Sequence, residues 1–260
     1  CIPRYPMSSS LVLHGVPLSQ PFRSVAWACV MKQLPFKVQL AVPGSSDKLG
    51  SKSAAFLHLS PPGAVPVLQH GNLTLSESAA ILEYLAATHA WTDLLPADPA
   101  GRAAVSEAMH WHHGGTRQLS AWFAEKVRPD LVGAVGEAAA AARKARGLEA
   151  LGLLERWQLG SSPFLAGRTS ASIADLLVYE DVGPLGKRFA NLVDLQAYPK
   201  VASWCARMEA LAGFEESHAA IAVLGDLSQS TTVSGRQLGD ATKAGLKALA
   251  AAQAGQSSKL

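Results

Sequence analysis

Strand-like segments are confined to the first third of this 260-residue chain, and the pattern beyond them is helical. Residues 11–14 form a short apolar run, residues 36–40 alternate between apolar and polar, and residues 65–68 and 73–75 flank a His-Gly-Asn turn. These segments predict four strands. After Pro96 such segments nearly vanish. The chain is therefore expected to fold as a small α/β domain followed by an all-helical domain.

Two predicted helices complete the first domain. Ser19 and Pro21 suit a helix start, because Ser is a good N-cap and Pro is tolerated in the first turn. Apolar residues then recur at helical spacing until Pro35, and a second periodic stretch begins at Glu77. The order strand, helix, strand, loop, strand, strand and helix fills residues 9–91.

Helical periodicity dominates residues 101–224. One periodic stretch covers residues 101–126 before Pro129 breaks it, and an alanine-rich stretch covers residues 137–157. Three shorter helices are predicted over residues 172–182, 201–211 and 216–224. Together these segments predict an all-helical second domain.

Composition excludes several classes of protein and site. The net charge is only +3 and no basic block of five residues occurs, so we expect no nucleic-acid partner. No apolar run approaches the roughly 18 residues that a membrane-spanning helix needs, so no membrane span is expected. Cys1, Cys29 and Cys205 are too few and too scattered for a disulfide framework or a thiolate metal site. His110 and His113 lack a carboxylate at ligand spacing, so no metal site is predicted.

Four motifs together resemble those of theta-class glutathione transferases, most closely the plant and algal members. They are S-Q-P-F-R at residues 19–23, V-P at 65–66 followed by S-E-S-A-A-I-L-E-Y-L at 76–85, W-H-H at 111–113 with Arg117, and the capping-box sequence S-I-A-D at 172–175. Each motif is weak alone, but the combination is specific. The resemblance covers residues 9 to 224 and implies a thioredoxin-like glutathione-binding domain, a helical substrate domain and a homodimer.

The resemblance also implies an activity. Glutathione is the co-substrate of these enzymes, which join its thiolate to small electrophiles or use it to reduce organic hydroperoxides. The alternative is a non-catalytic binding or structural module that keeps the same fold, because a fold alone does not establish turnover.

Ser19 is the residue that the resemblance assigns to the glutathione sulfur. A free thiol has a pKa of about 8.5, and moving it down by about two units takes roughly 2.7 kcal/mol. One hydrogen bond to a charged group supplies about 1.5–3 kcal/mol, so a single hydroxyl is sufficient. Spacing alone favours an ordinary N-cap at Ser19. Tyr5 precedes the first strand and is a weak alternative, and Cys29 is expected to be buried and unreactive.

Four further residues are implied to bind the glutathione backbone. In the resembled fold the peptide bond between Val65 and Pro66 is cis and Val65 pairs with the cysteinyl unit, although trans is the commoner state of such bonds. Ser78 is implied to hold the γ-glutamyl carboxylate at a helix N-terminus, with Glu77 near the γ-glutamyl ammonium group. The pattern alone fits a plain helix cap equally well.

The sequence departs from the theta pattern at the site of the glycine carboxylate. Ala64 stands where many theta enzymes carry Lys, and residues 50–53 lack the His of the preceding loop. Lys52 is the candidate substitute. Arg117 is implied to place a positive charge near the thiolate or the leaving group, and a solvated surface arginine is the alternative.

Residues 225–260 contain few large apolar side chains. We expect a mobile tail with at most a weak helix over residues 241–252. The final residues Ser258, Lys259 and Leu260 match the peroxisomal address, and an accidental terminus is the alternative. The expected location is the peroxisome, with or without a cytosolic pool, reached through an import receptor.

Overall fold

The computed structural model describes residues 10–132, 136–230 and 232–257. The first domain contains every predicted strand and helix, and its elements in order are β1 (Leu11–Gly15), α1 (Gln20–Met31), β2 (Phe36–Leu40), α2 (Ala54–Leu57), β3 (Val67–His70), β4 (Leu73–Ser76) and α3 (Ser78–Thr88). The strands form one sheet in the order β2-β1-β3-β4. β1 runs parallel to β2, and β3 runs antiparallel to both β1 and β4. This arrangement is the predicted thioredoxin-like fold.

Two details of this domain differ from the prediction. β3 begins at Val67 rather than at Val65. The one-turn helix α2 was not predicted, because four residues are too few to show a helical period. Its start is nevertheless specified locally, since the Ser53 hydroxyl accepts a hydrogen bond from the Phe56 amide at 3.3 Å.

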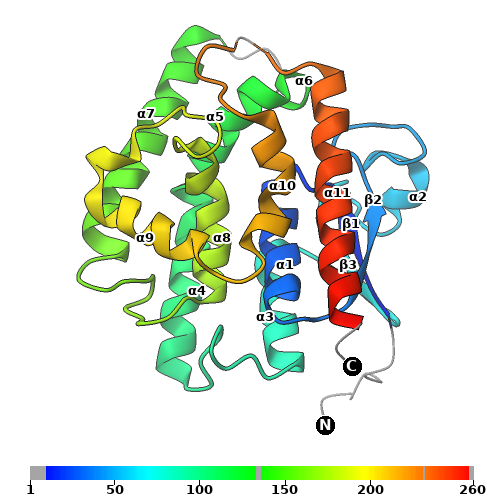
Figure 1. The fold of residues 1–260 in the computed structure, drawn as a ribbon, viewed down its shortest axis with the longest axis horizontal. Coiled ribbons are helices and arrows are strands. Elements are labelled where there is room, and N and C mark those ends of the chain that lie inside the picture. The colour runs from blue at the N-terminus through cyan, green and yellow to red at the C-terminus, as the bar shows by residue number, and fades with distance from the viewer. Residues whose placement is uncertain (1–9, 133–135, 231, 258–260) are drawn as a thin grey trace.

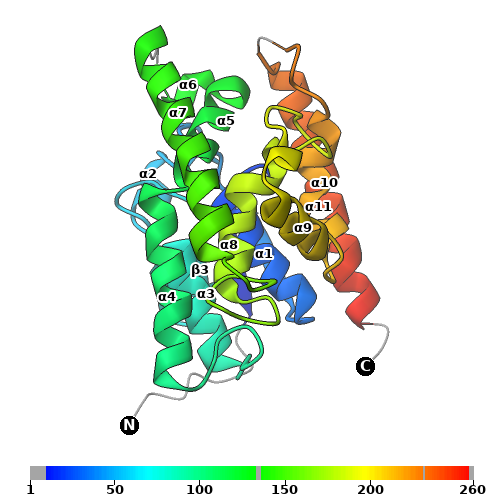
Figure 2. The same ribbon diagram turned by 90° about the vertical axis from the view of Figure 1, so that its left-hand side faces the viewer.

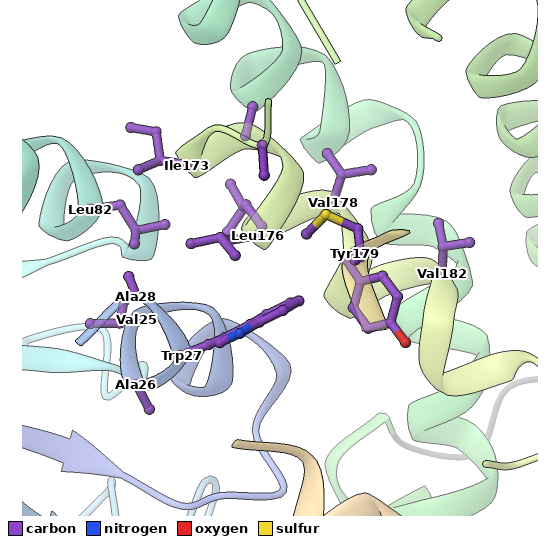
Figure 3. Packing of buried hydrophobic residues seen from close by; sticks show 14 of the residues in the cluster. Val25, Ala26, Trp27, Ala28, Leu82, Ile173, Leu176, Val178, Tyr179 and Val182 are labelled. Carbon is purple, nitrogen blue, oxygen red and sulfur yellow. The ribbon is translucent and has the colours of Figure 1, made fainter. Parts of the chain in front are cut away.

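Helix α1 connects the sheet to the helical domain. Phe22, Val25 and Trp27 are completely buried in it. The indole of Trp27 extends toward Tyr179 of the helical domain (Figure 3), and the two ring centroids are 5.5 Å apart at an interplanar angle of 72°. Helix α1 therefore packs in one core with residues of both domains.

The helical domain follows as α4 (Pro99–Gly114), α5 (Arg117–Val127), α6 (Pro129–Val132), α7 (Glu137–Leu153), α8 (Ile173–Val182), α9 (Pro199–Glu209) and α10 (Phe214–Leu224). A π-helical turn at Leu154–Gln158 continues α7, and short 3-10 turns occupy Gly183–Leu185 and Leu195–Ala197. Figures 1 and 2 show α8 in the middle of these helices, beside α1. No helix among the described residues is long and apolar enough to cross a membrane.

The periodic stretch over residues 101–126 is divided between two helices, α4 and α5. The chain leaves helical geometry at Gly115, where φ is −97° and ψ is −105°, and α5 begins only at Arg117. Gly114 and Gly115 lack a Cβ, so the backbone can leave the helical conformation here at a low cost in free energy. The break places Arg117 on the first turn of a new helix.

The predicted capping box of α8 is present. The Asp175 carboxylate accepts hydrogen bonds from the Ser172 amide at 2.8 Å and the Ser172 hydroxyl at 2.7 Å. It also accepts one from the Trp204 indole at 2.9 Å. Complete burial raises the pKa of Asp175 despite these bonds. Asp175 is therefore a structural residue that anchors α8 to its neighbours.

The C-terminal segment corrects the prediction of a mobile tail. Residues Gly235–Ser257 form the helix α11, which lies along α10 (Figures 1 and 2) and buries Ala241 and Leu249 almost completely. Small residues explain the difference, because Ala and Gly allow two helices to approach closely without a stripe of large apolar side chains. Ser258, Lys259 and Leu260 lie outside the described residues.

Candidate functional site

A cavity of about 770 Å³ lies between the two domains. The β1–α1 loop, the segment before β3, α5, the end of α8 and α11 all contribute to its wall, which includes Leu18, Ser19, Gly63, Ala64, Val65, Arg117, Phe123, Val127, Leu185, Leu238 and Leu246. Most of these side chains are apolar. The cavity therefore suits a largely apolar ligand beside a small set of polar groups.

Ser19 is the N-cap residue of α1 and lines this cavity. Its backbone is extended, with φ −74° and ψ 119°, and within the described residues its side chain makes no capping hydrogen bond. An ordinary N-cap would use its hydroxyl to accept from a backbone amide of the first turn. The Ser19 hydroxyl is therefore not committed to the cap, and it lies where the helix N-terminus favours negative charge.

Arg117 reaches the same cavity from the start of α5. Its side chain is 39% exposed, and its Nη1 lies 3.8 Å from Oδ1 of Asp181. The guanidinium is thus held by a loose ion pair at the cavity wall and still faces solvent. In this position the Arg117 guanidinium can bind an anion in the cavity.

The segment before β3 forms another part of the wall. The Val65–Pro66 peptide bond is cis, as the resemblance implies, and Val65 lines the cavity together with Gly63 and Ala64. Ser60 fixes this segment, because its hydroxyl lies 3.2 Å from the Ala64 carbonyl and 3.3 Å from the Ala64 amide.

Lys52 lies at the rim beside this segment. Its ammonium group donates a hydrogen bond to the Pro62 carbonyl at 2.7 Å. A Cβ added to Gly63 would lie 2.9 Å from Lys52 Nζ, so the ammonium is adjacent to the cavity wall. Lys52 is itself absent from the described cavity lining. The structure thus brings a cation close to Ala64, where the usual lysine is missing.

Glu77 and Ser78 lie at the start of α3, outside the set of described residues that line the cavity. Glu77 has φ 68° and ψ 115°, a left-handed conformation that costs a non-glycine residue about 1–3 kcal/mol. Burial lowers the pKa of His113, the charges of His112 and Arg117 lower it further, and the charge of Glu77 opposes them. The Glu77 carboxylate therefore acts electrostatically on His113 of α4.

Asp181 was not predicted from the sequence, yet its side chain accepts four hydrogen bonds from groups around the site. Its buried carboxylate accepts hydrogen bonds from the Ser120 hydroxyl at 2.5 Å, the Thr116 hydroxyl at 2.7 Å and His112 Nδ1 at 3.1 Å, and another from the Gln20 amide. Its neighbour Glu180, also missed, pairs with Arg23. A signal existed, because two acidic residues within an apolar run need buried partners.

This leaves the alternatives to Ser19, namely Cys29 and Tyr5, and the side chains that could bind a metal ion. Cys29 is confirmed as buried, and burial raises the pKa of its thiol to about 12, which disfavours the reactive thiolate. Tyr5 lies outside the described residues. Among the described residues no group of three His, Cys, Asp or Glu side chains could hold a metal ion.

Known proteins resemble this chain in both sequence and structure. Residues 13–96 match the family "Glutathione S-transferase, N-terminal domain". Human glutathione S-transferase theta-1 is 34% identical over 212 residues, which cover 78% of this chain and 85% of that protein. The crystal structure of human glutathione transferase theta-2 in complex with glutathione and an unknown ligand superposes with a TM-score of 0.74 at 28% identity, covering 93% of this chain and 99% of that one.

The apo structure of human glutathione S-transferase T1-1 superposes with a TM-score of 0.70 at 27% identity and covers 92% of this chain and 100% of that one. Sequence and structure therefore agree over nearly the whole length of these relatives. The chain belongs to the glutathione S-transferase family, and these relatives lie in its theta class.

Proposed function

We propose that this chain is a glutathione transferase in which the Ser19 hydroxyl donates a hydrogen bond to the glutathione sulfur. The observation that carries the proposal is the uncommitted hydroxyl at the N-terminus of α1, inside a cavity between the domains. A hydroxyl that donates to sulfur stabilises the thiolate over the thiol, and the thiolate is the nucleophile. The helix N-terminus adds a favourable field for the same charge.

Glutathione would extend from Ser19 across the first domain. The backbone of Val65, which lines the cavity before β3, can pair with the peptide-like cysteinyl unit in the manner of an added strand. The amides at the start of α3 and the Ser78 hydroxyl would hold the γ-glutamyl carboxylate, and Glu77 would attract the ammonium group. Lys52, whose ammonium borders Gly63, is the candidate for the glycine carboxylate.

The second substrate would occupy the apolar part of the cavity, between α5 and α11. In conjugation, the sulfur lone pair attacks carbon and the leaving group departs with the bonding electrons. In hydroperoxide reduction, the sulfur attacks the terminal oxygen and an alkoxide departs, which takes up a proton. Arg117 at the cavity wall would stabilise the departing anion in both cases.

Calorimetry with glutathione, followed by assays with an organic halide and an organic hydroperoxide, tests the proposal. Saturable binding with turnover of either substrate is the expected result. Binding without turnover of either substrate would instead favour a non-catalytic module of the same fold.

We further propose a homodimer that pairs through the apolar faces of α3 and α4, and import into peroxisomes through Ser258, Lys259 and Leu260. The family resemblance supports the dimer, and the sequence of the tripeptide alone supports the location. Light scattering at micromolar protein concentration is expected to give twice the mass of one chain, and a monomer mass would exclude the dimer.

A further inference from the structure

The loop that presents Ser19 is held by a residue of the following helix. Arg23 Nη1 donates hydrogen bonds to the carbonyl of Leu18 at 2.8 Å and to that of Pro17 at 3.4 Å. Arg23 is only 1% exposed, so its guanidinium is shielded from water. A buried cation needs compensating partners, and whatever fixes Arg23 also fixes the loop before Ser19.

Those partners come from the C-terminal half of the chain. Arg23 Nε donates to Oε2 of Glu180 at 2.7 Å, and the other carboxylate oxygen of Glu180 lies 3.1 Å from His218 Nε2. His218 belongs to α10, where its Nδ1 donates to the Phe214 carbonyl at 2.8 Å and its ring stacks on the Phe214 ring at 4.2 Å. Buried contacts therefore run from α10 through α8 to α1 and the Ser19 loop, and the approach of His218 Nε2 to Glu180 is an ion-pair contact without a hydrogen bond among the described residues.

Helix α11 meets the same loop directly. A Cβ built on Gly245 would lie 2.5 Å from the Pro17 Cβ and 2.9 Å from the Ala220 Cβ. Carbon atoms normally pack at about 3.5–4.0 Å, so no larger residue fits here without a shift. Gly245 thus allows α11 to lie against both α10 and the loop that carries Ser19.

We propose that α10 and α11 set the position of the Ser19 hydroxyl, through the chain His218–Glu180–Arg23 and through the contact of Gly245 with Pro17. The inference rests on the role proposed above for Ser19. Arg23, Glu180, His218 and Gly245 are positioning residues, because their contacts reach Ser19 through the loop; Arg23 and Glu180 also border the cavity. A small displacement of that loop lengthens the hydrogen bond from Ser19 to sulfur and weakens the preference for thiolate.

The direct test compares Gly245→Ala with Gly235→Ala. Both substitutions add one methyl group within α11, but beyond the helix's own backbone and the two chain neighbours no described heavy atom lies within 4 Å of a Cβ at Gly235. The readout is the ultraviolet absorbance of the thiolate in the glutathione complex without a second substrate, so binding of an electrophile against the α11 wall of the cavity does not enter. Gly245→Ala should lower the thiolate fraction at about pH 6.5 roughly three- to tenfold, and Gly235→Ala should leave it unchanged.

A second pair of variants keeps the inference testable if Gly245→Ala folds poorly. His218→Leu removes the nitrogen that faces Glu180, whereas His218→Gln offers an amide nitrogen near the same place. The leucine variant should lose thiolate and the glutamine variant should regain part of it. A purely structural role would lower the melting temperature and leave the thiolate titration in place.

The outcomes separate this inference from the proposal about Ser19. If Ser19→Ala alters the thiolate titration while Gly245→Ala and His218→Leu titrate like the wild type, the positioning role is overturned and the role of Ser19 stands. If Ser19→Ala titrates like the wild type, the role of Ser19 fails and this inference fails with it.

Discussion

The side-chain amide of Gln20 donates a hydrogen bond to the buried carboxylate of Asp181, which joins the residue after Ser19 to α8 of the helical domain. The same carboxylate accepts from Thr116 and Ser120, on either side of Arg117. One side chain therefore ties the first turn of α1 to the first turn of α5. The two sides of the cavity are held at a fixed separation before any substrate arrives.

Asp181→Asn should destabilise the protein by about 1–3 kcal/mol, because an amide cannot accept from all of these donors. The free energy of unfolding, measured with urea at about pH 7, tests this expectation. Turnover should fall as well, since Arg117 loses its partner at 3.8 Å. Wild-type stability in the variant would show that the hydrogen bonds to Asp181 contribute little.

The same residue predicts a dependence of stability on pH. Burial raises the pKa of Asp181, but hydrogen bonds from His112 and Ser120 and the charges of His112 and Arg117 outweigh it and hold the pKa below 3.8. A carboxyl with a lower pKa in the folded state stabilises that state above its unfolded pKa and loses this contribution as the pH falls through the folded value. Between about pH 5 and pH 2 the wild type should therefore lose more stability than Asp181→Asn. If the free energy of unfolding fell equally in the two proteins over this range, the lowered pKa of Asp181 would be contradicted.

Local signals explain why part of the site could be predicted from the sequence. Ser19 and Pro21 mark a helix start, and Val65 and Pro66 mark a strand entry, so each can be placed from its immediate neighbours. Of these residues, Ser19, Pro21 and Val65 line the cavity. The strands were predictable for the same reason, because alternation and turn residues are local.

The residues that were missed depend on distant partners. Glu180 pairs with Arg23 across 157 positions, and Asp181 binds Gln20 across 161 positions. No local pattern specifies such partners. The length and burial of α11 were underestimated for a related reason: its packing against α10 rests on small residues such as Ala241 and Gly245, which carry little hydropathic signal.

Ser78→Ala should weaken the thermal protection that glutathione gives. A ligand that binds only the folded state stabilises it by mass action, and this variant removes a hydroxyl at the N-terminus of α3. Ser161→Ala, an exposed change in a loop, is the matched control. Equal shifts of Tm with glutathione in all three proteins would remove Ser78 from the site.

Two substitutions address the glycine carboxylate of glutathione. Lys52→Met should weaken glutathione binding roughly two- to fivefold, and Ala64→Lys should strengthen it by a similar factor, because each changes one exposed cation near the carboxylate. Lys48→Met, in the same exposed loop, should leave the affinity unchanged. Calorimetric titrations of the four proteins decide the question. An unchanged Kd for Lys52→Met would show that this ammonium serves only the Pro62 carbonyl.

The location is tested in cells. A fluorescent protein fused before the chain should enter peroxisomes, and deletion of Ser258, Lys259 and Leu260 should leave it in the cytosol. Cytosolic fluorescence with the tripeptide intact would exclude the peroxisomal address.

Replacement of Ser19 tests the central claim most directly. Ser19→Ala should destabilise the bound thiolate by about 1.4–2.7 kcal/mol, and turnover at about pH 6.5 should fall roughly ten- to a hundredfold, with a smaller loss at high pH where the thiolate forms unaided. Ser19→Thr keeps a hydroxyl and should retain part of the activity.

The decisive measurement is the ultraviolet titration of the thiolate in the glutathione complexes of the wild type and Ser19→Ala. A titration displaced to higher pH in the variant, with glutathione affinity little changed, is the predicted result. A titration and a turnover at about pH 6.5 that match the wild type would contradict it and leave Ser19 as a helix-start residue with no role at the sulfur.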